Sequence, residues 1–317
     1  MAAGGFPLRR FVAIRISRAI EGAVHAAGID GTVEAVHRSA MNIRWGGQLL
    51  TVAHGSLGGL PNGVLVDPPV ALDQIGLAPG MAVQGDGIAL RVPGASMVVF
   101  LRGAVSWLPT LPSVNGPRIE GRVERAELAL ELAASQAPRV GLGPLLVGMV
   151  DEHTSVGSLG RAAASSLAEV LDALDDGAVE RATAAAIPLI GLGPGATPSG
   201  DDLLVGFIAG LAATDHPLAR AFAEGIARAA PGLTTSAAES YLLHAGRLEF
   251  SERVQDAAAA VLTGPEPGLV RAVTATLAWG APSGADLLVG LLVGIQASAP
   301  GLADRLRACG EERNVAP

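Results

Sequence analysis

Hydrophobic and polar positions follow two different rhythms in the two parts of this chain. From Gly31 they alternate in short β-branched segments, and Gly46-Gly47 separates two of these segments as a hairpin turn would. The expected strands are 32–37, 40–45, 48–53, 64–66, 81–83, 88–92 and 96–101, after a short helical pattern at 17–27. We therefore expect roughly residues 30–112 to form an all-β unit.

Beyond the proline-rich connection 109–117 the rhythm becomes helical. The expected helices are 119–136, 158–175, 178–190, 201–213, 217–230, 235–246, 251–263, 268–279 and 285–297. Breakers such as Gly177 and Pro217 separate them. The pattern predicts an α+β protein with a β-rich N-terminal domain, residues 1–115, followed by a larger all-helical domain, residues 116–317.

One segment of the helical part occurs twice. Pro198-Ser-Gly-Asp-Asp-Leu-Leu-Val-Gly206 returns 84 residues later as Pro282-Ser-Gly-Ala-Asp-Leu-Leu-Val-Gly290, with eight of nine positions identical. Each copy runs into an apolar helix with a second glycine four residues on, Gly210 and Gly294. Glycines at this spacing let two helices approach closely. We expect the helical domain to contain an internal loop–helix repeat whose two copies are adjacent and related by an approximate twofold axis.

The composition argues against several functions. The mean hydropathy is +0.42, but no apolar run reaches the roughly 20 residues of a membrane span. A net charge of −8 without a basic cluster argues against nucleic-acid binding. All 22 basic residues are arginines, which excludes Schiff-base lysine chemistry. The single cysteine, Cys309, excludes an internal disulfide and a cysteine-based zinc site. Without a signal-peptide pattern, we expect a cytoplasmic protein.

A glycine-rich loop precedes the first repeated helix. Gly193, Gly195 and Gly200 lie in it, together with Thr197. Such a loop exposes backbone N–H groups that suit an anion or a carbonyl oxygen. Asp201-Asp202 replaces the Lys-Ser/Thr of a Walker A loop, so we expect a ligand that presents an amide or amine beside an oxyanion. The structural alternative is a tight turn between packed helices.

Both repeats carry a Ser-x-x-Asp pattern at the start of their helix. Ser199 is followed by Asp202 and Ser283 by Asp286, and each pair resembles a capping box with Asp in place of Glu. On this interpretation the four residues serve chiefly to start two helices. The same side chains also lie where a bound substrate is expected, so they remain candidate binding residues.

Capping does not account for Asp201. The second repeat has Ala285 at the matching position, so the fold does not require this carboxylate. Asp201 is the leading catalytic candidate, orienting a reacting NH2 group, with Ser199 as the second. The alternative is a charge that only favours the positive end of the helix dipole.

Further polar candidates lie elsewhere in the chain. Asn62 falls in a glycine-rich turn of the β unit, and Thr234 and Thr235 precede a helix that carries His244. Their structural interpretation is a turn, a helix cap and an exposed helix face. No histidine pair has metal-binding spacing, and neither a zinc-protease nor a serine-hydrolase motif occurs. We therefore expect no metal and no cofactor.

The segment 191–202 closely resembles the signature of the AllH family, whose best-known member is a subunit of oxamate carbamoyltransferase from anaerobic allantoin breakdown. Thr234-Thr235, 244–250 and 283–286 support the resemblance, which extends from about His37 to Ile295. It implies a reaction of carbamoyl phosphate with oxamate that gives oxalurate and phosphate. It also implies partner subunits, one of them similar to acyl-CoA synthetase subunits, but it assigns no catalytic residue.

Two functions remain open at this point. The first is a component of a carbamoyltransferase of nitrogen metabolism that acts on oxamate or a related small amide or ureide. The second is a non-catalytic assembly subunit, whose repeated helices form a scaffold for partner chains.

Overall fold

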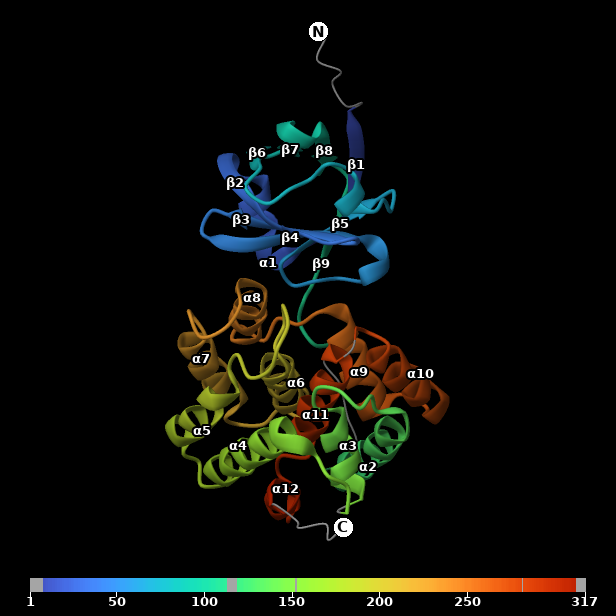
Figure 1. Ribbon diagram of the computed structural model, residues 1–317, viewed down its shortest axis with the longest axis vertical. Helices are drawn as coiled ribbons and strands as arrows, with labels where there is room; N and C mark the ends of the chain where they lie inside the picture. Colours follow the sequence, from blue (N-terminus) through green and yellow to red (C-terminus); the bar gives the residue numbers. More distant parts are fainter. Residues whose placement is uncertain (1–7, 113–118, 152, 281, 312–317) are drawn as a thin grey trace. The chain divides into compact units, whose positions relative to one another are not determined.

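The computed structural model describes residues 8–112, 119–151, 153–280 and 282–311 (Figure 1). Its contacts divide the chain into two units, Met1–Pro109 and Thr110–Pro317, each with its own hydrophobic core. The first unit is built of strands and the second of helices. The predicted fold class, α+β with a β-rich part followed by a larger helical part, is confirmed.

The first unit is a β-barrel. The described strands are β1 (Arg9–Ser17), β2 (Ala27–Val36), β3 (Ala40–Trp45), β4 (Gln48–His54), β5 (Gly63–Asp67), β6 (Ala82–Asp86), β7 (Ala89–Val92), β8 (Met97–Phe100) and β9 (Val105–Trp107). They run in the order β5-β4-β3-β2-β6-β7-β8-β1-β9, and β5 also pairs with β1. This second pairing closes the sheet through β1 and gives β5 a partner on both sides.

The barrel core follows from the alternation of side chains along each strand. Phe11 and Ala13 of β1 are buried, whereas Val12 between them is 49% exposed. Trp45 is fully buried, and its Nε1 donates to the carbonyl of Ala23 in α1 (Arg18–His25) at 3.1 Å. The indole therefore joins the barrel core to the helix that follows β1.

The barrel begins earlier than the sequence analysis expected. The first strand, β1, precedes the predicted start near residue 30, and β9 was not predicted either. Since β1 has large apolar residues on both faces, it lacks the clean alternation by which half-buried strands are recognised. β9 has only three residues, too few to show a periodic pattern.

The second unit is helical. Its described α-helices are α2 (Ile119–Gln136), α3 (Gly143–Val150), α4 (Gly157–Asp175), α5 (Val179–Ala186), α6 (Ser199–Ala213), α7 (Ala219–Ala229), α8 (Ser236–Ala245), α9 (Glu252–Thr263), α10 (Glu266–Leu277), α11 (Ser283–Ile295) and α12 (Leu302–Gly310). All the expected helices occur within a few residues of their predicted ends, whereas α3 and α12 were missed. α3 has no polar face that would reveal a helical period. Among the described helices, none is long and apolar enough to cross a membrane.

The two repeated helices, α6 and α11, pack directly against each other at the centre of this unit (Figure 1). A Cβ atom at Gly206 would lie 2.1 Å from the carbonyl oxygen of Leu287, and one at Gly290 would lie 1.9 Å from that of Leu203. The same pairing recurs one turn further on, at Gly210 against Leu291 and at Gly294 against Phe207. Because the 84-residue shift converts each contact into its counterpart, the predicted adjacency and approximate twofold relation are confirmed.

Candidate functional site

Both repeated helices begin at their serine without a side-chain cap. α6 starts at Ser199 and α11 at Ser283, and a proline occupies the preceding N-cap position in each. Neither helix has a cap hydrogen bond from a side chain, so the predicted capping boxes are wrong. The serines lie inside the first turn, and proline has no side-chain acceptor with which to cap the helix. The aspartates of the two motifs are therefore available for other contacts.

Each of these aspartates faces the serine of the other repeat. The hydroxyl of Ser283 lies beside the carboxyl group of Asp202, and the hydroxyl of Ser199 lies beside that of Asp286. The Thr197 hydroxyl is 3.0 Å from that of Ser283 and lies next to Asp202 as well. The serine of each Ser-x-x-Asp motif thus lies beside the aspartate of the other motif, on the two sides of the twofold axis. Together these residues form a shared polar cluster.

Burial changes the protonation of this cluster. It raises the pKa of Asp202 to about 8, against the lowering effect of the Ser283 and Thr197 hydroxyls. The nearby Asp286 carboxylate raises the pKa of Asp202 further. For Asp286 itself, burial raises the pKa to about 6, against the Leu142 amide and the Ser199 hydroxyl. Around neutral pH, Asp202 is consequently a protonated acid and a hydrogen-bond donor.

Two carboxyl oxygens in this cluster have no internal partner. Asp202 Oδ2 and Asp286 Oδ2 are both buried, and no described group reaches them with hydrogen-bond geometry. The Ser199 hydroxyl lies near Asp286 but also falls short of that geometry. Unpaired buried polar atoms are costly, so a ligand with complementary groups would stabilise this cluster.

Asp201, the leading catalytic candidate from the sequence, is occupied by internal contacts. It is 1% exposed, and the Gly191 amide donates to its Oδ1 at 3.1 Å. The Thr234 hydroxyl donates to its Oδ2 at 2.6 Å. Burial raises the pKa of Asp201, against the lowering effect of these two donors. Asp201 therefore ties the glycine-rich loop to the segment before α8, and Thr234 serves the same connection.

The loop between Gly191 and α6 presents backbone donors. Gly193 and Gly195 adopt φ values of +103° and +113°, a region that favours glycine. Within the part of the chain that the structure describes, the N–H groups of Gly193, Gly195, Ala196 and Thr197 donate to no protein acceptor. Residues 194–196 are exposed. These donors can therefore bind an anion from solution, next to the N-terminus of α6.

Gly200 and Thr235 have structural contacts that the sequence did not specify. The Gly200 amide donates to the carbonyl of Leu192 at 2.9 Å, and a Cβ atom on Gly200 would lie 1.9 Å from the oxygen of Leu189. Thr235 is the N-cap of α8, where its hydroxyl accepts from the Ala238 amide at 3.2 Å. The hydroxyl of Thr235 also lies against the Ala196 carbonyl. Both residues shape the loop, and their role in substrate binding stays a prediction.

His244 lies in a separate polar cluster at the end of α8. Its Nδ1 is 2.7 Å from Glu249 Oε2, and Arg247 Nε donates to the same oxygen at 3.0 Å. The imidazole is 4% exposed, and burial lowers its pKa. Asn62 belongs to the β unit, where it is 1% exposed. Substrate binding by His244 and Asn62 stays a prediction.

The structure reveals a second glycine loop that the sequence analysis missed. Gly141-Leu-Gly-Pro144 repeats Gly191-Leu-Gly-Pro194, and both begin with a glycine at positive φ. The Leu142 amide donates to Asp286 Oδ1 at 2.6 Å, which holds this loop at the start of α11. The four-residue identity was visible in the sequence. It does not stand out there because the loop at 141–144 precedes α3 in the chain, whereas in the folded structure it contacts the start of α11.

These features define the class of protein. It joins a β-barrel to a helical unit in which two repeated helices bring their glycine loops and acidic residues together. Two family models match the chain: the AllH family N-terminal domain over residues 12–106, and the oxamate carbamoyltransferase subunit AllH over residues 189–295. The chain belongs to the AllH family. No curated protein and no solved structure matches it.

Proposed function

We propose that this chain is a component of a carbamoyltransferase that holds carbamoyl phosphate and oxamate, or a related small amide or ureide, at the start of α6 and α11. The observation that carries this proposal is the half-buried Asp202 side chain, whose buried Oδ2 has no partner and whose pKa is raised to about 8, beside a loop with free N–H donors. The family description, a subunit of oxamate carbamoyltransferase, supports the same chemistry.

The protonation of Asp202 makes the site suitable for an anion. An ionised carboxylate at this place would repel a phosphate or an oxamate carboxylate. A pKa of about 8 leaves the side chain largely neutral near pH 7. The N–H groups of Gly193, Gly195, Ala196 and Thr197 and the positive end of the α6 dipole then attract the anion. Asp286, whose pKa is about 6, keeps its negative charge near pH 7, and the Leu142 amide donates to it.

The reaction places specific demands on such a site. The amide nitrogen of oxamate attacks the carbamoyl carbon, the bond from that carbon to the phosphate oxygen breaks, and phosphate leaves with the electron pair. The loop N–H groups hold the oxyanion of the tetrahedral centre, an effect of about 2.7–4 kcal/mol per donor. In the reverse direction the leaving nitrogen needs a proton, which the Asp202 carboxyl supplies. In the forward direction the ionised form of Asp202 takes that proton back.

The rival function is a non-catalytic assembly subunit, in which the repeated helices only support partner chains. On that hypothesis the Asp202 proton has no chemical role, and the loop binds no substrate. The two functions therefore differ in what Asp202→Asn does, because asparagine keeps the size and neutrality of the protonated acid but cannot transfer its proton.

The test is phosphorolysis of oxalurate by the complex of this chain with its partner subunits, measured as carbamoyl phosphate formed. Asp202→Asn should lower turnover about a hundredfold or more, while phosphate binding by calorimetry stays close to that of the wild type. Glu224→Gln, which removes an exposed carboxylate on α7, is the matched control and should leave turnover unchanged. Full turnover by Asp202→Asn in an intact complex would refute the catalytic proposal and favour the assembly subunit.

A further inference from the structure

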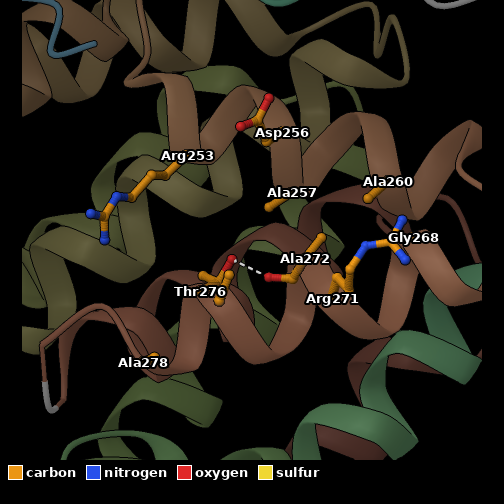
Figure 2. Close-up of a pocket in the computed structure, with 10 residues that line it drawn as sticks. Arg253, Asp256, Ala257, Ala260, Gly268, Arg271, Ala272, Thr276 and Ala278 are labelled. Carbon is orange, nitrogen blue, oxygen red and sulfur yellow. Dashed lines mark hydrogen bonds between the residues drawn. The ribbon is translucent and has the colours of Figure 1, made fainter. Parts of the chain in front are cut away.

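A cavity lies between α9 and α10, and its lining includes none of the residues proposed above to bind the carbamoyl substrates. Its volume is about 630 Å³. Figure 2 shows α9 and α10 side by side with the lining side chains between them. A volume of this size is in the range of small-molecule sites, which is about 300–1,000 Å³.

The floor of this cavity is made of alanine side chains. Ala257 and Ala260 come from α9, and Ala272 and Ala275 from α10. The Thr276 hydroxyl, which also lines the cavity, donates to the Ala272 carbonyl at 2.8 Å and so offers little polarity to a ligand (Figure 2). Small side chains leave an apolar trough that the flexible chain of an amphipathic molecule can fill.

The charged side chains that line the cavity favour a negatively charged ligand. Arg253 and Arg271 extend toward opposite ends of the lining, and Asp256 is the single acidic side chain among the lining residues (Figure 2). The Arg253 guanidinium lies 5.1 Å from the ring centroid of Trp279, so this end is closed by an existing contact. Arg271 is exposed, and no described acceptor or carboxylate pairs with it. The guanidinium group of Arg271 can therefore donate two hydrogen bonds to one carboxylate.

We propose that this cavity binds a small organic monoanion, with its carboxylate on Arg271 and its apolar chain over the alanine floor. Two guanidinium groups and one carboxylate give the lining an excess of one positive charge, which matches one negative head group. The occupant is distinct from the substrates of the carbamoyl reaction, because those are small and polar throughout and would leave the alanine floor unfilled.

The test is calorimetric titration of the full chain with three probes of equal length: octanoate, 1-octanol and octylammonium. Octanoate should bind about tenfold more tightly than 1-octanol, and octylammonium should not bind measurably. Arg271→Gln should weaken octanoate about tenfold and leave 1-octanol unchanged. Arg220→Gln, an exposed arginine on α7, is the matched control and should change neither.

A second variant keeps the proposal testable if Arg271→Gln disturbs the fold. Ala275 is an exposed lining residue on α10. The larger side chain of Ala275→Leu should occupy the floor of the cavity and so weaken the binding of octanoate and of 1-octanol alike. Binding of octanoate no tighter than that of 1-octanol, or preferred binding of octylammonium, would overturn the proposal. Octanoate binding that both Arg271→Gln and Ala275→Leu leave intact would also overturn it, by placing the site elsewhere.

Discussion

Gly290→Ala is the substitution that tests how closely the two repeated helices must pack. A Cβ atom at this position would lie 1.9 Å from the carbonyl oxygen of Leu203 and 2.7 Å from the amide nitrogen of Phe207. Both are backbone atoms of α6, so no side-chain rotation can relieve the contact. The two helices must therefore move apart along the crossing that forms the centre of the helical unit.

The expected cost follows from two opposing contributions. Alanine is favoured over glycine within a helix by about 1 kcal/mol. Overpacking of a close-packed interior costs about 1–3 kcal/mol and occasionally more, and a clash between backbones belongs at the upper end of that range. We expect a net loss of about 2–3 kcal/mol in the free energy of unfolding. For a unit of this size, that loss lowers the melting temperature by roughly 4–12 °C.

The assay is calorimetry and urea unfolding followed by helix circular dichroism. Gly206→Ala is the twofold-related variant, with its Cβ atom 2.1 Å from the Leu287 oxygen, and should lose a similar amount. Gly268→Ala in α10 is the control, because its nearest neighbour is a Pro265 side-chain carbon at 3.4 Å. This control should be neutral or slightly stabilising.

Equal stability of Gly290→Ala and Gly268→Ala would refute the close backbone crossing. A loss at Gly290 without a comparable loss at Gly206 would contradict the twofold equivalence of the repeats.

Two further predictions concern Asp202 and its neighbour Asp201. Burial raises the folded pKa of Asp202 to about 8 and that of Asp286 to about 6, both from an ordinary value of 3.8, so the folded chain binds more protons than the unfolded chain above pH 4. The free energy of unfolding should therefore fall as the pH rises from about 4 to 8. The wild-type chain should lose about 1 kcal/mol between pH 7 and 8 because of Asp202, and Asp202→Asn should not show this loss. Urea titration at each pH measures both. An unchanged slope in that variant would show that Asp202 is ionised in the folded protein. Asp201→Ala leaves the Gly191 amide and the Thr234 hydroxyl without their acceptor, so it should cost about 2–4 kcal/mol of stability, more than the roughly 0.3–1 kcal/mol of a surface carboxylate at a helix start. A loss below 1 kcal/mol in urea unfolding would mean that the loop does not depend on this anchor.

Much of the architecture could be predicted from local patterns. Alternation and helical periodicity identified most of the strands and helices, because side-chain direction repeats every two residues in a strand and every 3.6 residues in a helix. The repeated segment with its spaced glycines predicted that α6 and α11 are neighbours, since close helix packing requires small residues at that spacing. The same segment carried the resemblance to the AllH family, and the family models bear this out.

The contacts of neighbouring side chains in the site could not be predicted in this way. Asp201 and Asp202 are adjacent in the sequence, and local reasoning assigned the first to chemistry and the second chiefly to a helix cap, with substrate binding left open. In the folded chain Asp201 is held by Gly191 and Thr234, whereas Asp202 faces Ser283 across the twofold axis.

The sequence by itself determined most of the strands and helices, the change from β to helical structure and the pairing of the repeats. Only the tertiary structure decided the closure of the barrel through β1 and β5, the exchange of aspartates between repeats and the protonation of Asp202. The physical reason is the same in all three cases. Sheet closure, hydrogen-bond partners and desolvation depend on groups that are distant along the chain, and these groups come together only when the chain is folded.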